Sequence, residues 1–328
     1  MFLISLAIVL GAFVLSVLAN ILLQRLSSGF GIFMTKGTPV FGGLTIWGAF
    51  TVAAYWGIGV GKVPSSEAGA ILGTSFVMLV FGIIDDQKEL SVTGKLLTQI
   101  FSVTLLMYFG VKTQIVYIGP FINAFLTLVW VVGIANAFNH LDISDGVAGV
   151  TGILTSCAFL IISVLNHDKS NLILSLALCG ALSGFLVFNF PPAKIYMGNA
   201  GSHFLGFVFA AVAIAISYAP LERKTALFSP ILILGLPILD TAFLILVRMR
   251  KRKIPFQKSN DHIILRLKTL GYSGRKIFCI MGLWGLFFAA AGIAVSQFPN
   301  QWGLITVAIA GAFSFKIIKI ISKVPVND

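Results

Sequence analysis

Long apolar stretches separated by short polar breaks form the main pattern of this chain. A helix needs about 20 mainly apolar residues to cross about 30 Å of hydrocarbon, so each stretch of that length is a candidate membrane span. Eleven such stretches lie near residues 2–23, 38–60, 67–84, 95–112, 117–138, 146–165, 170–188, 202–219, 226–247, 277–297 and 302–320. The pattern predicts an all-α polytopic membrane protein with about eleven transmembrane helices.

Composition agrees with a membrane protein and excludes a water-soluble globule. Hydrophobic residues make up 58% of the 328 positions, and only 10% are charged. The first stretch has no basic residue before it and no clear cleavage site, so we expect a retained helix. Cys157, Cys179 and Cys279 lie within apolar stretches without CxxC spacing, which argues against a disulfide framework or a zinc site. We expect one integral-membrane domain over residues 1–328.

Basic residues are distributed unequally between the two sets of loops. One set, which includes the C-terminus, carries 18 Lys and Arg residues and the other carries five. The positive-inside rule therefore predicts that the C-terminus and the loops on its side are cytoplasmic. The same bias explains most of the net charge of +12. Anionic lipid headgroups and phosphates are thus better candidate partners than nucleic acid.

Acidic residues gather on the predicted cytoplasmic side. Six of the eleven carboxylates fall in its breaks, namely Asp85, Asp86, Glu89, Asp142, Asp145 and Asp261. Adjacent carboxylates at a helix end point about 100° apart, so Asp85 and Asp86 can serve two tasks. A solvated helix terminus is the alternative explanation. Together, the acidic breaks predict metal and phosphate chemistry at the membrane edge.

The break after the fifth stretch carries a polar series. Asn136, Asn139, Asp142 and Asp145 recur every three residues, so a continuing helix would present them as one polar ridge. Such a ridge could hold a sugar, a nucleotide or a hydrated cation. Helix capping by Asn and Asp is the alternative, although it explains only one or two of the four.

Two further breaks carry candidate phosphate contacts. Gly198-Asn199-Ala-Gly201 precedes a predicted helix N-terminus, where glycines let backbone amides approach a phosphate, and Lys194 adds a cation. A tight re-entry turn is the competing interpretation. The basic run over residues 248–253 favours orientation and headgroup contact over catalysis. His262, beside an aspartate, could orient a phosphate.

The order and spacing of these motifs resemble the polyprenyl-phosphate N-acetylhexosamine-1-phosphate transferase family. The resemblance covers nearly the whole chain. The motifs that carry it are Thr38-Pro39 with Gly42-Gly43, Asp85-Asp86, the segment 136–146, the turn 197–202, Pro237-Ile-Leu-Asp240, and Pro255-Phe256 ahead of His262. The pattern Pro-Phe-x-x-x-x-x-His is closer to the branch of the family that uses GlcNAc than to the branch that uses the peptidoglycan precursor.

The resemblance implies an activity. Family members transfer N-acetylhexosamine 1-phosphate from a UDP-sugar to undecaprenyl or another polyprenyl phosphate, with Mg²⁺ and in some cases Mn²⁺, and release UMP. This step starts the synthesis of cell-wall polymers, lipopolysaccharide and other envelope polysaccharides. A multi-pass protein of the cell inner (plasma) membrane, with a cytoplasmic active site, is implied. Family members can also dimerise, so a homodimer is among the implied assemblies.

The resemblance also implies roles for particular residues. The implied catalytic residues are Asp85, Asp86, Asp142, Asp145 and His262. Those implied to bind substrate are Lys95, Asn136, Asn139, Asn189, Lys194, Gly198 and Arg250. Asp86 and Asn199 are the implied metal ligands.

Three departures from the family pattern keep a second function open. Asn199 replaces a metal-binding Asp, only His262 is left of a His-x-His-His segment, and Ile143 replaces a glycine between Asp142 and Asp145. A working transferase is the first hypothesis. A weak or inactive relative that binds the lipid carrier as an accessory protein is the second. A transporter is disfavoured because Asp240 is the one carboxylate well inside a predicted span.

Overall fold

The structure is a computed structural model that describes residues 2–30, 34–35, 37–64, 66–252 and 261–326. Within these residues, nine helices are long and apolar enough to cross a membrane. They are α1 (Phe2–Phe30), α2 (Gly42–Gly61), α3 (Ser66–Gln87), α5 (Pro120–Leu141), α6 (Val147–Leu165), α7 (Lys169–Asn189), α8 (Gly198–Ala215), α12 (Gly274–Gln297) and α13 (Asn300–Ile321). The prediction of an all-α polytopic membrane protein is confirmed.

The two remaining predicted spans are also helical but differ from a straight membrane helix. The apolar helix α4 (Val92–Tyr108) is only 17 residues long. The stretch predicted near 226–247 is bent: the 3-10 helix η1 (Lys224–Phe228) and α9 (Ser229–Ile233) meet α10 (Gly235–Arg250) at 75°, the geometry of a broken span or of a re-entrant loop. Each of the eleven apolar stretches therefore corresponds to helical structure.

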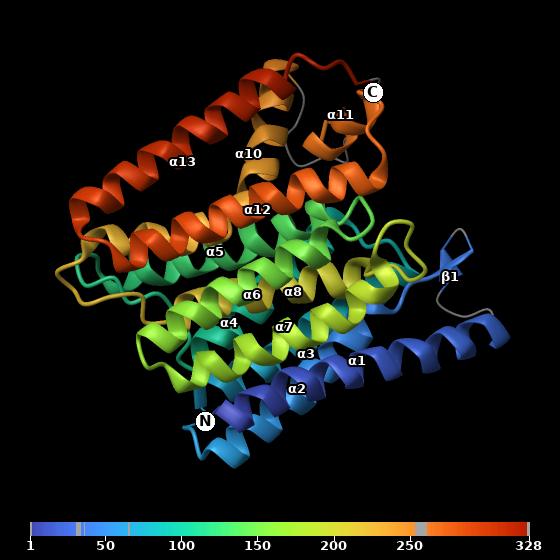
Figure 1. Ribbon diagram of the computed structural model, residues 1–328, viewed down its shortest axis with the longest axis horizontal. Coiled ribbons are helices and arrows are strands. Elements are labelled where there is room, and N and C mark those ends of the chain that lie inside the picture. Colours follow the sequence, from blue (N-terminus) through green and yellow to red (C-terminus); the bar gives the residue numbers. More distant parts are fainter. Residues whose placement is uncertain (1, 31–33, 36, 65, 253–260, 327–328) are drawn as a thin grey trace.

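Short elements complete the fold. The helix α11 (Ile263–Thr269) precedes α12, and β1 (Met34–Thr35) pairs antiparallel with β2 (Thr38–Pro39) between α1 and α2. Figure 1 shows α12 and α13 on one side of the bundle, α1 on the opposite side, and α10 crossing the direction of α12. The Pro255-Phe256 motif and Lys253, the last residue of the basic run, lie outside the described residues.

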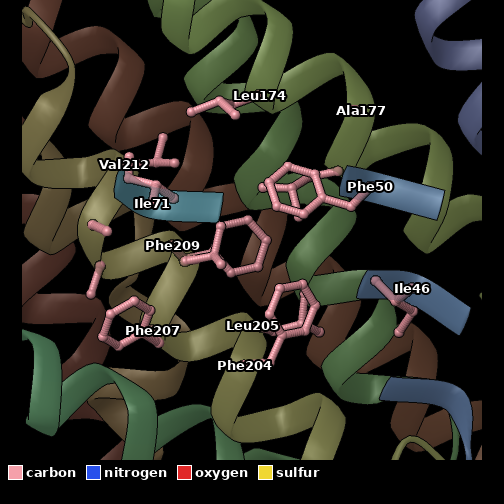
Figure 2. Close-up of a cluster of buried hydrophobic side chains, with 14 of the residues drawn as sticks. Ile46, Phe50, Ile71, Leu174, Ala177, Phe204, Leu205, Phe207, Phe209 and Val212 are labelled. Carbon is pink, nitrogen blue, oxygen red and sulfur yellow. The ribbon is translucent and has the colours of Figure 1, made fainter. Parts of the chain in front are cut away.

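The most buried candidate span is α8, at the centre of the bundle. Helices α3 and α5 pack along it, and α2 crosses it as well. Its phenylalanines Phe204, Phe207 and Phe209 are fully buried and meet side chains from α2, α3 and α7 (Figure 2). After its first turns, which carry Asn199, Ser202 and His203, this helix is apolar on all sides, as expected for a core helix. It fixes the relative positions of the helices around it.

Two glycines at the start of α2 allow this helix to lie very close to α8. Gly42 and Gly43 donate backbone hydrogen bonds to the carbonyls of Tyr196 and Met197, just before α8. A Cβ atom on Gly43 would lie 2.3 Å from the backbone nitrogen of Gly201, so no larger residue fits without movement. The Gly-Gly motif therefore brings the start of α2 against the start of α8. The polar ends of several spans meet at this level.

Candidate functional site

Asp86, at the C-terminal end of α3, caps the N-terminus of α8. Its carboxylate accepts hydrogen bonds from the backbone amides of Asn199 at 2.8 Å and Ala200 at 3.0 Å. A negative charge at a helix N-terminus is stabilised by the helix dipole. The sequence predicted a phosphate at these amides, but in this structure a carboxylate binds them.

Gly198 makes that contact sterically feasible. Its φ is +75°, a left-handed conformation that glycine adopts without a Cβ penalty. A Cβ atom here would also lie 2.7 Å from Oδ2 of Asp86. The structure therefore places Gly198 at the predicted turn, next to the carboxylate of Asp86.

The neighbouring Asp85 is buried and fully partnered. One oxygen accepts the backbone amide of Leu90 at 2.9 Å, and the other accepts Nζ of Lys95 at 2.6 Å. The carboxylate of Asp85 is inaccessible, whereas about a quarter of the Lys95 side chain remains exposed. The pair joins the end of α3 to the start of α4 and holds one ammonium group near the membrane edge.

The two asparagines of α5 have different surroundings. Asn136 exchanges hydrogen bonds with Gln99 of α4 at 2.9 and 3.2 Å. Asn139 donates to Oδ1 of Asn199 at 2.9 Å and to Oγ of Ser202 at 3.0 Å. The structure thus brings Asn139 to the predicted metal position, while the amide of Asn136 joins two helices.

The predicted polar ridge does not continue as a helix. Helix α5 ends at Leu141, and Asp142 is its C-terminal cap. Asp142 and Asp145 therefore lie in the turn between α5 and α6, because the backbone leaves helical geometry before them. That turn is held by Asp145, which accepts the amide of Ala193 at 3.0 Å.

Asn189, at the end of α7, also fixes this turn. Its Oδ1 accepts the amide of Gly146 at 2.9 Å, and its Nδ2 donates to the carbonyl of Ile195 at 2.8 Å. Both ends of the side-chain amide therefore bind backbone. This role is structural and differs from the direct substrate contact that was predicted.

Asp142 is the unpartnered carboxylate of this region. Within the described part of the chain, no hydrogen-bond donor reaches it. Burial and the nearby charges of Asp86 and Asp145 raise the pKa of the Asp142 carboxyl well above its usual value. An ionised Asp142 is therefore costly unless a cation or a proton compensates its charge.

A second polar group lies where α10 and the segment before α11 approach α5. Nδ1 of His262 lies 2.9 Å from Oδ2 of Asp240, and the other oxygen of Asp240 accepts the amide of Ile263 at 3.0 Å. Asp240 is fully buried. Its pairing with His262 was not predicted from the sequence. A buried acid in an apolar helix and a lone histidine were the only signals in the sequence.

Comparisons with known proteins place the chain in a family. Residues 68–217 match the model described as "Glycosyl transferase family 4". A probable undecaprenyl-phosphate N-acetylglucosaminyl 1-phosphate transferase from Bacillus subtilis is 31% identical, over 80% of this chain and 74% of the relative. The chain belongs to glycosyl transferase family 4.

Two further relatives carry different names. A decaprenyl-phosphate N-acetylglucosaminephosphotransferase from Mycobacterium leprae is 31% identical over 80% of this chain and 74% of the relative. A phospho-N-acetylmuramoyl-pentapeptide-transferase from Streptococcus agalactiae is 32% identical over 55% of this chain and 60% of the relative. The match to the first two relatives is the more extensive one.

Some predicted site residues of this family 4 protein take no part in the hydrogen bonds described above. Lys194 and Arg250 are exposed. Neither side chain has a hydrogen bond or ion pair among the described residues. Asp261 pairs with Lys251 at 2.8 Å and Arg266 at 3.0 Å. The charge of the Asp261 carboxylate is therefore balanced by two basic side chains of the protein.

The site fits a metal that takes most of its ligands from substrate and water. Among the described residues, no group of three His, Cys, Asp or Glu side chains could hold an ion by itself. Mg²⁺ commonly binds one or two carboxylates together with substrate phosphates and waters. Asp142 has no hydrogen-bond donor among the described residues, and the nearby charge of Asp86 contributes to its raised pKa. These hard oxygen ligands suit Mg²⁺ once an anionic substrate adds its own oxygens.

Proposed function

We propose that this chain transfers N-acetylhexosamine 1-phosphate from a UDP-sugar to a polyprenyl phosphate, giving a polyprenyl-diphospho-sugar and UMP. The observation that carries the proposal is the meeting of Asp86, Asn139, Asp142 and Asn199 where α3, α5 and α8 begin or end. A site at the ends of the spans is open to a lipid from the membrane and to a nucleotide from water. The named activities of the relatives support the same reaction.

The reaction forms one bond and breaks one bond. An oxygen of the lipid phosphate attacks the β-phosphorus of the UDP-sugar, and the bond from that phosphorus to the bridging oxygen breaks, so UMP leaves. Both reactants are anions that repel each other in water. The protein's task is therefore to align them and balance their charge.

Mg²⁺ or Mn²⁺ would lower that repulsion by neutralising the diphosphate and the leaving UMP. Asp86 and Asp142 would hold the ion. Asn199 brings no negative charge, and its Oδ1 already accepts a hydrogen bond from Asn139. We therefore expect Asn199 to contribute less to metal affinity than an aspartate would.

The protein's own groups would position the substrates. Lys95, held by Asp85 at 2.6 Å, presents an ammonium that can bind a phosphate of the lipid. His262, oriented by Asp240, can bind another phosphate oxygen. Asp145 and Asn189 keep the turn that carries Asp142 in place. Asp85 and Asp240 thus act through the neighbours that they orient.

An apolar cavity beside Asp86 supports a lipid acceptor. Its volume is about 90 Å³, and its walls come from α1, α2, α3, α8 and the segment before α2. Asp86 is its one charged lining residue. Part of an isoprenoid chain could therefore lie against apolar walls while its phosphate reaches the polar cluster.

The predicted orientation completes the proposal. The excess of basic residues on one side supports a cytoplasmic C-terminus and active site in the cell inner membrane. A role in cell-wall or other envelope polysaccharide synthesis would follow from the product. A homodimer stays a prediction.

The test is UMP release by the purified full chain in detergent, with undecaprenyl phosphate, a panel of UDP-N-acetylhexosamines, and Mg²⁺ or Mn²⁺. We expect metal-dependent release with UDP-GlcNAc. The Asn199→Asp variant should need less Mg²⁺ for half-maximal release, because it adds a charged ligand. Lipid binding without release in the native chain, at any metal concentration, would instead indicate the accessory protein.

A further inference from the structure

Two histidines from distant parts of the sequence lie next to each other. His140 is in the last turn of α5, and His262 immediately precedes α11. Their ring centroids are 5.6 Å apart and the rings are tilted by 60°. Only four histidines occur in the chain. Half of them therefore lie side by side, and one of the two, His140, is two residues before Asp142 in the sequence.

The inner nitrogens of both rings face side chains of α10. Nδ1 of His262 pairs with Asp240 at 2.9 Å, and Nδ1 of His140 lies 3.5 Å from Oγ1 of Thr241. In the described part of the chain neither Nε2 atom has a hydrogen-bond partner, and neither is completely shielded from solvent. The outer nitrogens of both rings are therefore available to a ligand.

The ligand class follows from charge and spacing. Nδ1 of His262 is taken up by Asp240, so Nε2 is the nitrogen left to contact a phosphate oxygen, and a hydrogen bond spans about 2.9 Å. The ring centroids are 5.6 Å apart, which is close enough for one phosphoryl group to contact both rings. The pair cannot be the core of a protein-only metal site, because no three ligating side chains among the described residues could hold an ion.

We propose that His140 and His262 together bind a phosphate group of a substrate, with His140 as a further binding residue. The inference rests on the proposed function, which supplies the phosphate. Where the family pattern has further histidines, this chain has Ile264 and Leu265, and Ile264 is fully buried in an apolar cluster. The second imidazole is provided by α5 in place of α11.

Histidine NMR of the full chain in detergent tests this pair directly. With four histidines, selective labelling gives four ring signals, and the His140→Gln and His262→Gln variants assign two of them. His167, exposed in the loop between α6 and α7, is the internal control. A short-chain polyprenyl phosphate and UDP-GlcNAc are the two probes, so the source of the phosphate is distinguished.

We expect the His140 and His262 signals to move together with at least one probe while His167 stays in place. His140→Phe should weaken binding of that probe about tenfold or more, and His140→Gln less, because its amide can still donate a hydrogen bond. Saturating amounts of both probes that leave the two signals unmoved would overturn the proposal. Turnover with unmoved signals would refute this site alone, whereas moved signals without turnover would refute the proposed reaction alone.

Discussion

The two acidic regions at the ends of α3 and α5 look alike in sequence but differ in structure. At the end of α3, all four carboxylate oxygens of Asp85 and Asp86 accept hydrogen bonds from within the protein. At the end of α5, Asp142 has no donor among the described residues, and the charges of nearby carboxylates act on it. The carboxylates of the first region already bind protein groups on neighbouring helices, whereas Asp142 in the second keeps both of its oxygens for a cation or substrate. Pairs of acidic residues therefore do not have equal functional weight.

Replacing Asp142 with Asn should have the largest effect and tests the difference between these two acidic regions. Turnover should fall by a hundredfold or more, on the order of the contribution of one positioned acid–base or metal-binding group. UMP release is the measurement. Asp168→Asn is the matched control. Asp168 is the N-cap of α7, in a loop on the opposite face of the protein, and Asn also caps helices well. Retained turnover in Asp142→Asn would show that this carboxylate is not part of the site.

The same variant has an opposite effect on stability. Because the folded-state pKa of Asp142 is raised, its ionised form opposes folding at neutral pH, and Asn removes that cost. Asp142→Asn should therefore unfold at a higher temperature than the native chain at neutral pH. The difference should vanish once the pH falls below the ordinary pKa of aspartate. A lower unfolding temperature at neutral pH would contradict the described surroundings.

Asp85→Asn should chiefly reduce stability. Removing one partner of a buried ion pair costs about 3 kcal/mol, because the remaining charge loses its compensation. Thermal unfolding in detergent measures the loss. Lys95→Met in the same background should restore part of it, since the unpaired ammonium is then absent. If the double variant lost as much stability as the two single variants added together, the two residues would not interact.

Gly198→Ala tests the approach of Asp86 to α8. A left-handed conformation costs a non-glycine residue about 1–2 kcal/mol, and the new Cβ atom would also meet Oδ2 of Asp86. We expect a lower unfolding temperature together with weaker metal activation. Gly311→Ala, within α13 where nothing lies near the new atom, is the control. The same small effect at both positions would contradict the close contact.

Asn136→Ala should have the smallest effect. The loss of its amide pair with Gln99 should cost about 1 kcal/mol, as for an ordinary side-chain hydrogen bond. Turnover should stay within about twofold of the native value, because the amide joins two helices. A large rise in KM for the UDP-sugar without a change in stability would instead show that Asn136 contacts the substrate, as the sequence predicted.

The fold followed from the sequence because hydrocarbon imposes a simple rule on length and polarity. Each of the eleven apolar stretches is helical, including the broken one near 226–247. Its 75° bend was not predicted because the stretch remained apolar across the break, although Gly235 and Pro237 at the start of α10 are helix-breaking residues. The polar ridge over residues 136–145 also required helical geometry beyond Leu141, where α5 ends, since spacing alone does not show where a helix stops. Hydrophobic pattern therefore gives the spans but not their interruptions.

The site was only partly predictable. Sequence selected Asp86, Asn139, Asp142 and Asn199, which the structure brings to one region. It could not distinguish Asn136 from Asn139, because both lie on α5 and only packing shows that one faces α4 and the other α8. The partners of long-range contacts have no local signal.

The most direct test of the central claim follows the β-phosphate of the donor. UDP-GlcNAc labelled at that phosphate is incubated with the native full chain, undecaprenyl phosphate and Mg²⁺, and the lipid and aqueous fractions are separated. Transfer of sugar 1-phosphate predicts label in the lipid fraction and an equal amount of unlabelled UMP in the aqueous one. Label that stays entirely in the aqueous fraction, with folded protein that still binds the lipid, would contradict the transferase.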